Sequence, residues 1–144
     1  EPVLITPIGH QLAKKNQVNM NDISQYGLIL SPQHMSTWQM VDLVFKQYNV
    51  DYKVKLEAGG WEVLKKYVEK GLGVSIITDI CLSGEENLER VSLTQFFPKR
   101  TYGLFLRKGK VLSPAAREFI QYIDPHAVEM FRTEENRKGK KYRT

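Results

Sequence analysis

The sequence predicts an α/β fold with a mostly parallel five-stranded sheet flanked by helices. Short β-rich runs alternate along the chain with segments of helical periodicity, and such alternation favours parallel strands joined by helices. Residues 72–78 form an apolar run of the kind found in central, buried strands. The chain has 144 residues, of which 42% are hydrophobic and 26% charged, so it can form a core without disulfides.

Five segments are predicted to be strands, because each is a short run of β-forming residues closed by Pro, Gly or polar residues. The third alternates Tyr52, Val54 and Leu56 with charged residues, which indicates one solvated face near a sheet edge. Residues 81–100 show no clear period and are expected to be a long irregular connection. The five predicted strands are residues 2–8, 26–32, 51–58, 72–78 and 101–109.

Four segments are predicted to be helices, and the three longer ones carry large apolar residues along one face. Ser36 or Thr37 can supply the capping oxygen of the second helix. Gly71 is suited to end the third helix in a left-handed conformation. In the fourth, Ser113 is the expected cap and Pro114 the first helical residue. The predicted helices lie at residues 20–24, within 33–50, at 61–70 and at 113–123.

The charge is concentrated at the end of the chain. The formal net charge is +5, and residues 132–144 contain six basic and two acidic residues, which gives them +4 of that total. The remaining chain is nearly neutral and lacks the basic face expected of a nucleic-acid-binding surface. We therefore expect one domain at residues 1–126 and a basic, solvated tail at residues 127–144. No apolar run approaches the ~20 residues that span a bilayer, so no membrane partner is expected.

No pattern typical of catalysis or metal binding is evident. His10, His34 and His126 lack ligand spacing, so neither a metal nor a cofactor is expected. Cys81 is the single cysteine, which suits a reducing compartment. Its acidic neighbours argue against a reactive thiolate and favour a small, half-buried residue. There is no phosphate-binding loop and no nucleophile paired with a base, so no catalytic residues are expected.

Two loops are the strongest candidates for a ligand site. "SPQHMST" at residues 31–37 and "EAGG" at residues 57–60 each join the carboxyl end of a predicted strand to a helix N-terminus. Such termini bind anions through free backbone N–H groups, without any need for Arg or Lys. Ordinary capping explains either loop alone, but two loops meeting at one crevice favour a small-ligand site. The candidate residues are Ser31, Gln33, Ser36, Thr37, Gly59, Gly60 and, closing the next strand at the same edge, Thr78.

Three segments of the chain resemble the effector-binding domain of LysR-type transcriptional regulators. They are "PIGHQLAKKNQVNMNDISQYGLIL", "AGGWEVLKKYVEKGLGVSIITD" and "YGLFLRKGKVLSPAAREFIQYI". The chain departs from the family pattern at Gln11, where proline is usual, and at Thr78 and Asp79, where Leu-Pro usually follows the apolar pair. The closing "FIQYIDPH" is most similar to the cysteine-biosynthesis regulator subgroup.

This resemblance implies a fold similar to a subdomain of type 2 periplasmic binding proteins, with an effector in a cleft. It implies a non-catalytic, cytoplasmic, ligand-sensing domain for a small metabolite, which the loops lead us to expect to be anionic. It also implies self-association, and contact with DNA only through an N-terminal winged helix-turn-helix domain that this chain lacks, together with the first half of subdomain one.

Two alternatives remain open on the sequence alone. A solute-binding protein of a transport system would share the fold, although the start of the chain has no signal-peptide pattern and no disulfide can form. A small α/β enzyme is the other, although it would need a paired nucleophile and base. The sequence upstream of Glu1 would distinguish the three.

Overall fold

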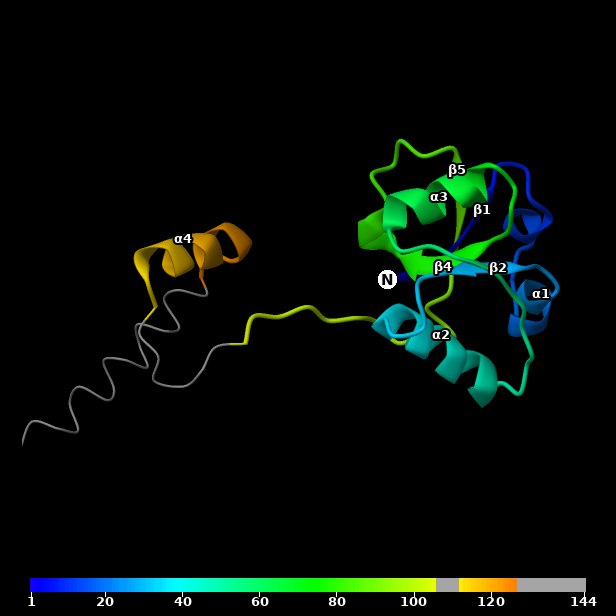
Figure 1. The fold of residues 1–144 in the computed structure, drawn as a ribbon, viewed down its shortest axis with the longest axis horizontal. Helices are drawn as coiled ribbons and strands as arrows, with labels where there is room; N and C mark the ends of the chain where they lie inside the picture. The colour runs from blue at the N-terminus through cyan, green and yellow to red at the C-terminus, as the bar shows by residue number, and fades with distance from the viewer. Residues whose placement is uncertain (106–111, 127–144) are drawn as a thin grey trace, which may run out of the picture. The chain divides into compact units, whose positions relative to one another are not determined.

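The computed structural model describes residues 1–105 and 112–126, and the chain divides into two compact units, residues 1–101 and 102–144. The first unit contains five strands and three α-helices, with two short 3-10 helices (Figure 1). Its elements are β1 (Pro2–Pro7), η1 (Gln11–Lys14), α1 (Met20–Ser24), β2 (Leu28–Leu30), α2 (Ser36–Gln47), β3 (Val54–Glu57), α3 (Trp61–Glu69), β4 (Ser75–Thr78), η2 (Asp79–Cys81) and β5 (Leu88–Ser92).

The strands form two hydrogen-bonded sheets that meet at one point. β1 pairs antiparallel with β4 on one side and with β5 on the other. β2 and β3 form a parallel pair. A parallel bridge between Leu28 and Val74 joins the two sheets, with the Ile29 N–H donating to the Val74 oxygen at 2.8 Å. β4 therefore lies between β1 and β2.

The α/β class is confirmed, but the mostly parallel sheet is wrong for the part of the chain described here. Only β2, β3 and the bridge to β4 are parallel, whereas β1 is antiparallel to both neighbours. The parallel rule holds for strands joined by a crossover helix. β1 is followed only by the short η1 and α1, and β5 is reached through the short η2 and a loop at residues 82–87, so neither strand is constrained to run parallel.

One predicted strand was misplaced along the chain. Residues 101–105 have no regular structure, and the rest of the predicted strand at 101–109 lies largely outside the described residues. The strand in this part of the chain is β5, within the segment predicted to be irregular. Its apolar residues Leu88 and Val91 are only half-buried, and their spacing gives no period-two signal.

Two helices cover opposite faces of the strands, α2 on one side and α3 on the other (Figure 1). Successive side chains of a strand point to opposite faces, and the core follows this rule. Leu28 and Leu30 pack in the cluster that contains the α2 side chains, whereas Ile29 packs with those of α3. Likewise Ile76 faces α2 and Ile77 faces α3. The apolar run of β4 is thus explained by burial on both faces.

The helix ends follow the sequence signals with one exception. Asn19 caps α1 in a reciprocal capping box with Asp22, and Gly71 has a φ of 73° after α3. In contrast, neither Ser36 nor Thr37 caps α2. Met35 occupies the N-cap position and makes no side-chain cap hydrogen bond. The hydroxyls of Ser36 and Thr37 lie inside the first turn of α2 and accept hydrogen bonds from Arg100.

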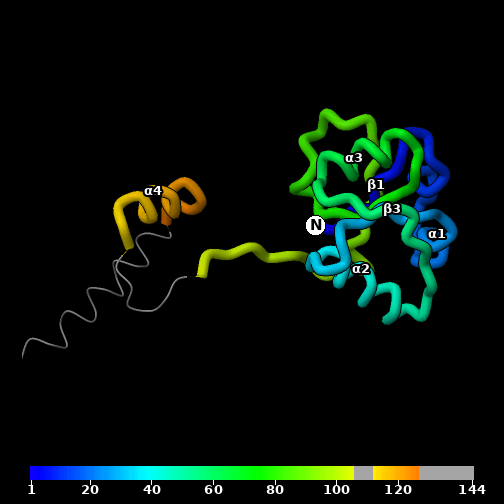
Figure 2. Tube along the Cα trace, viewed as in Figure 1, coloured from blue at the N-terminus to red at the C-terminus, as the bar shows by residue number. Residues whose placement is uncertain are grey.

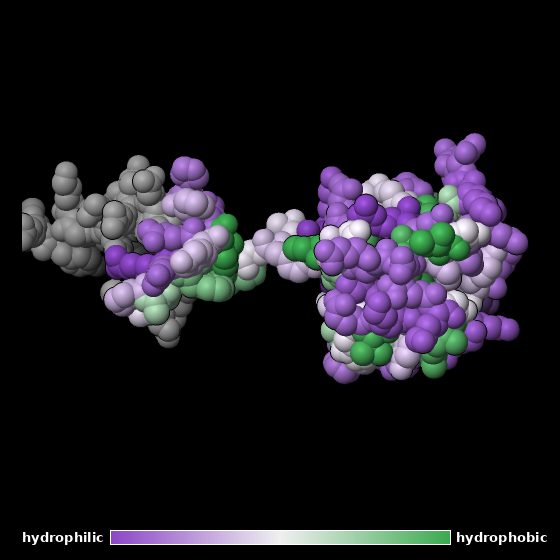
Figure 3. All heavy atoms as spheres, turned by 90° about the horizontal axis from the view of Figure 1, so that it is seen from above, coloured by the Kyte–Doolittle hydropathy of each residue, from purple (hydrophilic) through white to green (hydrophobic). Residues whose placement is uncertain are grey.

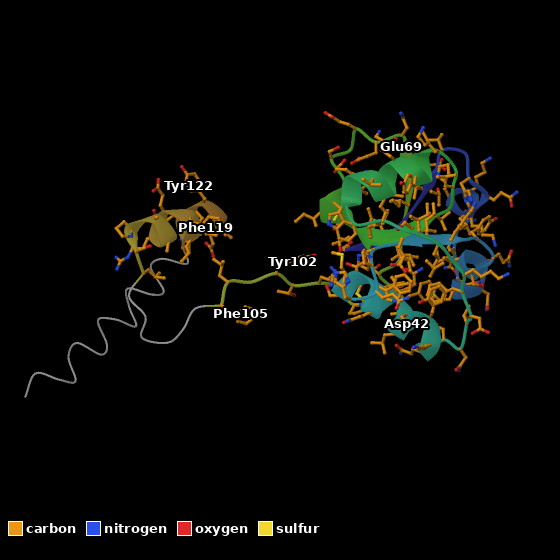
Figure 4. The ribbon with its side chains drawn as sticks, viewed as in Figure 1. Asp42, Glu69, Tyr102, Phe105, Phe119 and Tyr122 are labelled. Carbon is orange, nitrogen blue, oxygen red and sulfur yellow. The ribbon has the colours of Figure 1, made fainter. Side chains whose placement is uncertain are left out.

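Apolar side chains on the surface of the first unit are scattered, and the face seen in Figure 3 is mainly hydrophilic. Within the described part of the second unit, α4 (Pro114–Ile123) begins as predicted, with Ser113 as its cap and Pro114 in the first turn. Phe119 and Tyr122 on this helix (Figure 4) are 61% and 83% exposed.

We predict that Gly73→Ala destabilises the first unit. A Cβ atom at Gly73 would lie 2.4 Å from the carbonyl oxygen of Gly27, at the junction of the two sheets. Because backbone must move to relieve this contact, the free energy of unfolding should fall by about 1–3 kcal/mol. Urea denaturation checks the prediction, with Gly103→Ala as control because a Cβ there meets nothing within 4 Å. Equal midpoints for the two variants would contradict it.

Candidate ligand-binding site at two helix N-termini

The carboxyl ends of three strands meet at one edge of the first unit. β2 and β3 are parallel, and the bridge makes β4 parallel to β2. The chain leaves β2 through Ser31 towards α2, and it leaves β3 through Ala58 towards α3. The Ala58 N–H donates to the Leu30 oxygen at 2.9 Å, which holds the two loops side by side. Figure 2 follows this path from α2 through β3 to α3.

A pocket of about 50 Å³ lies between these loops. This is room for only a few non-hydrogen atoms, since one water molecule has a share of about 30 Å³ in the liquid. Three of the predicted residues line it, and three lining residues were not predicted. The lining residues are Ser31, Gly59 and Gly60, with Met35, Ala58 and Trp61.

The first amides of both helices are free of side-chain caps. Met35 and Gly60 are the N-cap residues of α2 and α3, both with extended backbone, and neither helix has a side-chain cap hydrogen bond. The first N–H groups of a helix have no acceptor within it and carry a partial positive charge. Two sets of such donors therefore begin beside one small pocket.

Ser31 contributes an unsatisfied polar group to the wall of the pocket. Its side chain is buried, with 3% of the residue exposed, and its Oγ is the only buried side-chain N or O atom without a hydrogen-bond partner in residues 1–105 and 112–126. Leaving a buried hydroxyl unsatisfied costs ~1–3 kcal/mol. Because Ser31 lines the pocket, a ligand atom there would provide the partner that the protein does not.

Arg100 was not predicted, and it contacts two of the predicted residues although it does not itself line the pocket. Its guanidinium donates to Ser36 Oγ at 2.6 Å and to Thr37 Oγ1 at 3.0 Å. The sequence argument required no Arg or Lys near the site and did not include Arg100. Arg100 lies more than sixty positions along the chain from these hydroxyls, in the segment 81–100 without periodicity. No local sequence signal links it to α2.

The other four predicted residues are not among those that line this pocket. Ser36 and Thr37 accept hydrogen bonds from Arg100 in the first turn of α2. Gln33 is exposed in the turn before α2. Thr78 ends β4 at the same edge as Ser31, but it is buried and is not among the residues that line the pocket. Their role in ligand binding stays a prediction.

A second, wider depression of about 540 Å³ lies between α3 and residues 80–86. Buried Lys65 is its main feature, with Nζ 2.7 Å from Glu86, 2.8 Å from Glu62 and 3.0 Å from the Cys81 oxygen. Lys65 and loop N–H groups hold the pKa of Glu86 well below its usual range. Burial raises the pKa of the Cys81 thiol, which disfavours a reactive thiolate. These contacts hold residues 80–86 against α3, and the two carboxylates neutralise the positive charge of Lys65.

Within the described ranges, no group of three or more His, Cys, Asp or Glu side chains is arranged to hold a metal ion. The helices described here also include none with the length and apolar character required to cross a membrane.

Residues 1–127 match the LysR substrate binding domain. The chain belongs to this family. Among relatives of the LysR domain, the uncharacterized HTH-type transcriptional regulator YybE of Bacillus subtilis (strain 168) is 26% identical over 129 residues, covering 90% of this chain and 44% of YybE. The HTH-type transcriptional regulator CysB of Burkholderia cenocepacia is 26% identical over 123 residues, covering 84% and 39%. This chain thus spans less than half the length of these relatives.

The solved structures confirm the fold of the LysR domain. The regulatory domain of CcmR from Synechocystis PCC6803, in complex with 2-PG, has a TM-score of 0.69 and 26% identity, covering 84% of this chain and 60% of that one. The chain therefore has the fold of LysR effector-binding domains and covers 60% of the CcmR regulatory domain. Its relatives are transcriptional regulators and not transport proteins, and CysB is among them, as the closing segment indicated.

We predict that Glu86 stabilises the fold above about pH 4.5 and loses this effect in acid. Because its pKa is lowered in the folded state from an ordinary value of 4.5, its contribution is present above that value and declines as the pH falls towards the folded pKa. Glu86→Gln should lower the urea midpoint near neutral pH and flatten its decline in acid. Glu85→Gln, at the exposed neighbour, is the matched control, and identical pH profiles for the two variants would contradict the prediction.

Proposed function

We propose that this chain senses a small anionic metabolite on behalf of a LysR-type transcriptional regulator. The observation that carries the proposal is the pocket between two uncapped helix N-termini, with the unpartnered hydroxyl of Ser31 in its wall. Backbone N–H groups at helix N-termini favour negatively charged groups. The CcmR regulatory domain, which has a similar fold, is in complex with the small molecule 2-PG.

The site is suited to binding and not to catalysis. Its polar groups are amides, hydroxyls and a guanidinium, all of which can donate hydrogen bonds to an anion. The pocket lining contains no side chain that could act as a general base for the Ser31 hydroxyl. The relatives are named as transcriptional regulators, which agrees with a non-enzymatic role.

The whole protein is proposed to act by a population shift. In this proposal residues 1–126 belong to the effector-binding domain, residues 127–144 are a basic tail, and DNA is contacted only through an N-terminal domain outside this chain. The regulator is cytoplasmic and self-associates, and its effector favours one geometry of the assembly. The greater length of the relatives, their HTH-type names and the exposed side chains of α4 support this arrangement.

We predict that Ser31→Ala separates binding from stability. Removing an unsatisfied hydroxyl should leave the free energy of unfolding unchanged or raise it by ~1 kcal/mol. The same change should weaken binding of the effector, or of sulfate or phosphate as a probe, several-fold. Thermal shift of the full-length regulator at constant ionic strength measures both effects.

The matched control for Ser31→Ala is Thr6→Val. Thr6 is also buried, but its hydroxyl donates to the Pro7 oxygen. It lies in β1 just past the first residue of β4, whereas Thr78 is the last residue of that strand. This variant should be less stable and bind normally. A stability loss in Ser31→Ala with unchanged binding would show that the hydroxyl has a structural role only.

We predict that Gly60→Asp abolishes anion binding and leaves the fold intact. A Cβ at Gly60 meets nothing within 4 Å, and the backbone φ there is −144°, which any residue can adopt. Aspartate is a good N-cap, so α3 should be as stable as before or more so. Its carboxylate would take the free amides and repel an anionic ligand. Gly60→Asn, which caps without the charge, should retain more binding; unchanged affinity in Gly60→Asp would move the site elsewhere.

A further inference from the structure

We propose that Arg100 is a specificity-determining ligand contact, which restricts this site to oxyanions such as carboxylates, phosphate or sulfate. The inference rests on the proposed function and adds a residue and a charge requirement to it. Arg100 also joins the site to the chain that leaves the first unit. The effector would therefore touch the segment whose position a regulator must change.

The geometry leaves Arg100 free to bind more than it now does. A guanidinium has five N–H donors in a planar fork, and the two hydrogen bonds to Ser36 and Thr37 use one on each terminal nitrogen. Both acceptors are in the first turn of α2, directly after Met35, which lines the pocket. The hydroxyls therefore hold the guanidinium at the first turn of α2, next to the helix end that borders the pocket, and they leave further N–H donors of Arg100 unused.

The charge around Arg100 is unbalanced. The first turn of α2 contains no acidic residue, although the N-terminus of this helix carries its own partial positive charge. In the described part of the chain, Arg100 forms no ion pair with a carboxylate. Holding a guanidinium beside the positive end of a helix costs electrostatic free energy. An anion bound between the guanidinium and the helix end would offset this cost. A neutral or cationic ligand would not remove this repulsion, which is why the site should select oxyanions.

The pocket supplies an independent sign that an oxygen-rich group belongs here. Ser31 Oγ is buried and unpartnered in its wall, and the first amides of α3 begin there as well. One oxyanion has enough oxygen atoms to accept from the α2 amides and the guanidinium while another atom meets Ser31. No single cap residue could satisfy all of these donors together.

An oxyanion bound by Arg100 would also affect the segment of chain that follows this residue. Arg100 is the second-last residue of the first unit, and the second unit begins at Tyr102. An oxyanion that engages Arg100 fixes the start of the segment that leads into the second unit. Occupancy of the site should therefore be measurable in the backbone of residues 101–105.

The test uses the full-length regulator with sulfate and phosphate as probes, titrated against chloride at constant ionic strength. Arg100→Gln should raise the apparent Kd for both probes at least tenfold, and Arg100→Lys should lie between this variant and the wild type. Arg90→Gln makes the same change of charge at an exposed position of β5 and should alter the Kd less than twofold. Hydrogen exchange at residues 101–105 should slow when the probe binds to the wild type, and not in Arg100→Gln.

The outcomes separate this inference from the proposed function. If Arg100→Gln binds like Arg90→Gln while Gly60→Asp and Ser31→Ala lose binding, Arg100 is not a ligand contact and the site stands without it. If all of these variants bind like the wild type, the site itself is wrong. Should Arg100→Gln fail to fold, Arg100→Lys decides, because it keeps the charge and loses the fork: binding equal to the wild type overturns the inference.

Discussion

The contact between β2 and β4 is the constraint on which the rest of the first unit depends. Two glycines bring the backbones together, and the Val74 N–H donates to the Gly27 oxygen at 3.1 Å. The Ser75 hydroxyl, fully buried, adds a hydrogen bond of 2.6 Å to the Ile29 oxygen. These bonds set β4 parallel to β2, so that strands from both sheets end at one edge. Without this junction the two sheets would share no common register.

The same junction gives the site its position and its chemistry. Because β2 and β3 are parallel, each continues into a helix on the same edge, and α2 and α3 then pack on opposite faces. Their N-termini are therefore brought to one pocket by topology and not by side chains. The sequence leaves these ends uncapped, with Met35 and Gly60 at the N-cap positions, although Asn19 and Ser113 cap other helices. This contrast favours a ligand at the first two ends.

Much of this arrangement could be predicted from local pattern. The helices, the loops after residues 30 and 57, and the glycine stop at Gly71 have short-range causes, namely periodicity, capping and turn chemistry. Strand direction could not be predicted, because β1 and β5 find their partners through residues far apart in the chain. β5 was missed for the same reason: its pairing with β1 defines it, and Leu88 and Val91 alone do not. Arg100 was missed because a hydrogen bond across more than sixty positions leaves no periodic trace.

Lys65 and Arg100 differ in how far the fold neutralises their positive charge. Lys65 is buried and surrounded by Glu62, Glu86 and a backbone oxygen, so its charge is balanced within the protein and serves to hold the loop after η2. Arg100 is half-buried, and among the residues that the structure describes its guanidinium is hydrogen-bonded to two neutral hydroxyls at a positive helix end. A charge neutralised inside the fold stabilises it and offers little to a ligand. A charge that is positioned but not neutralised is available to a ligand, and the proposed role of Arg100 in recognition rests on this difference from Lys65.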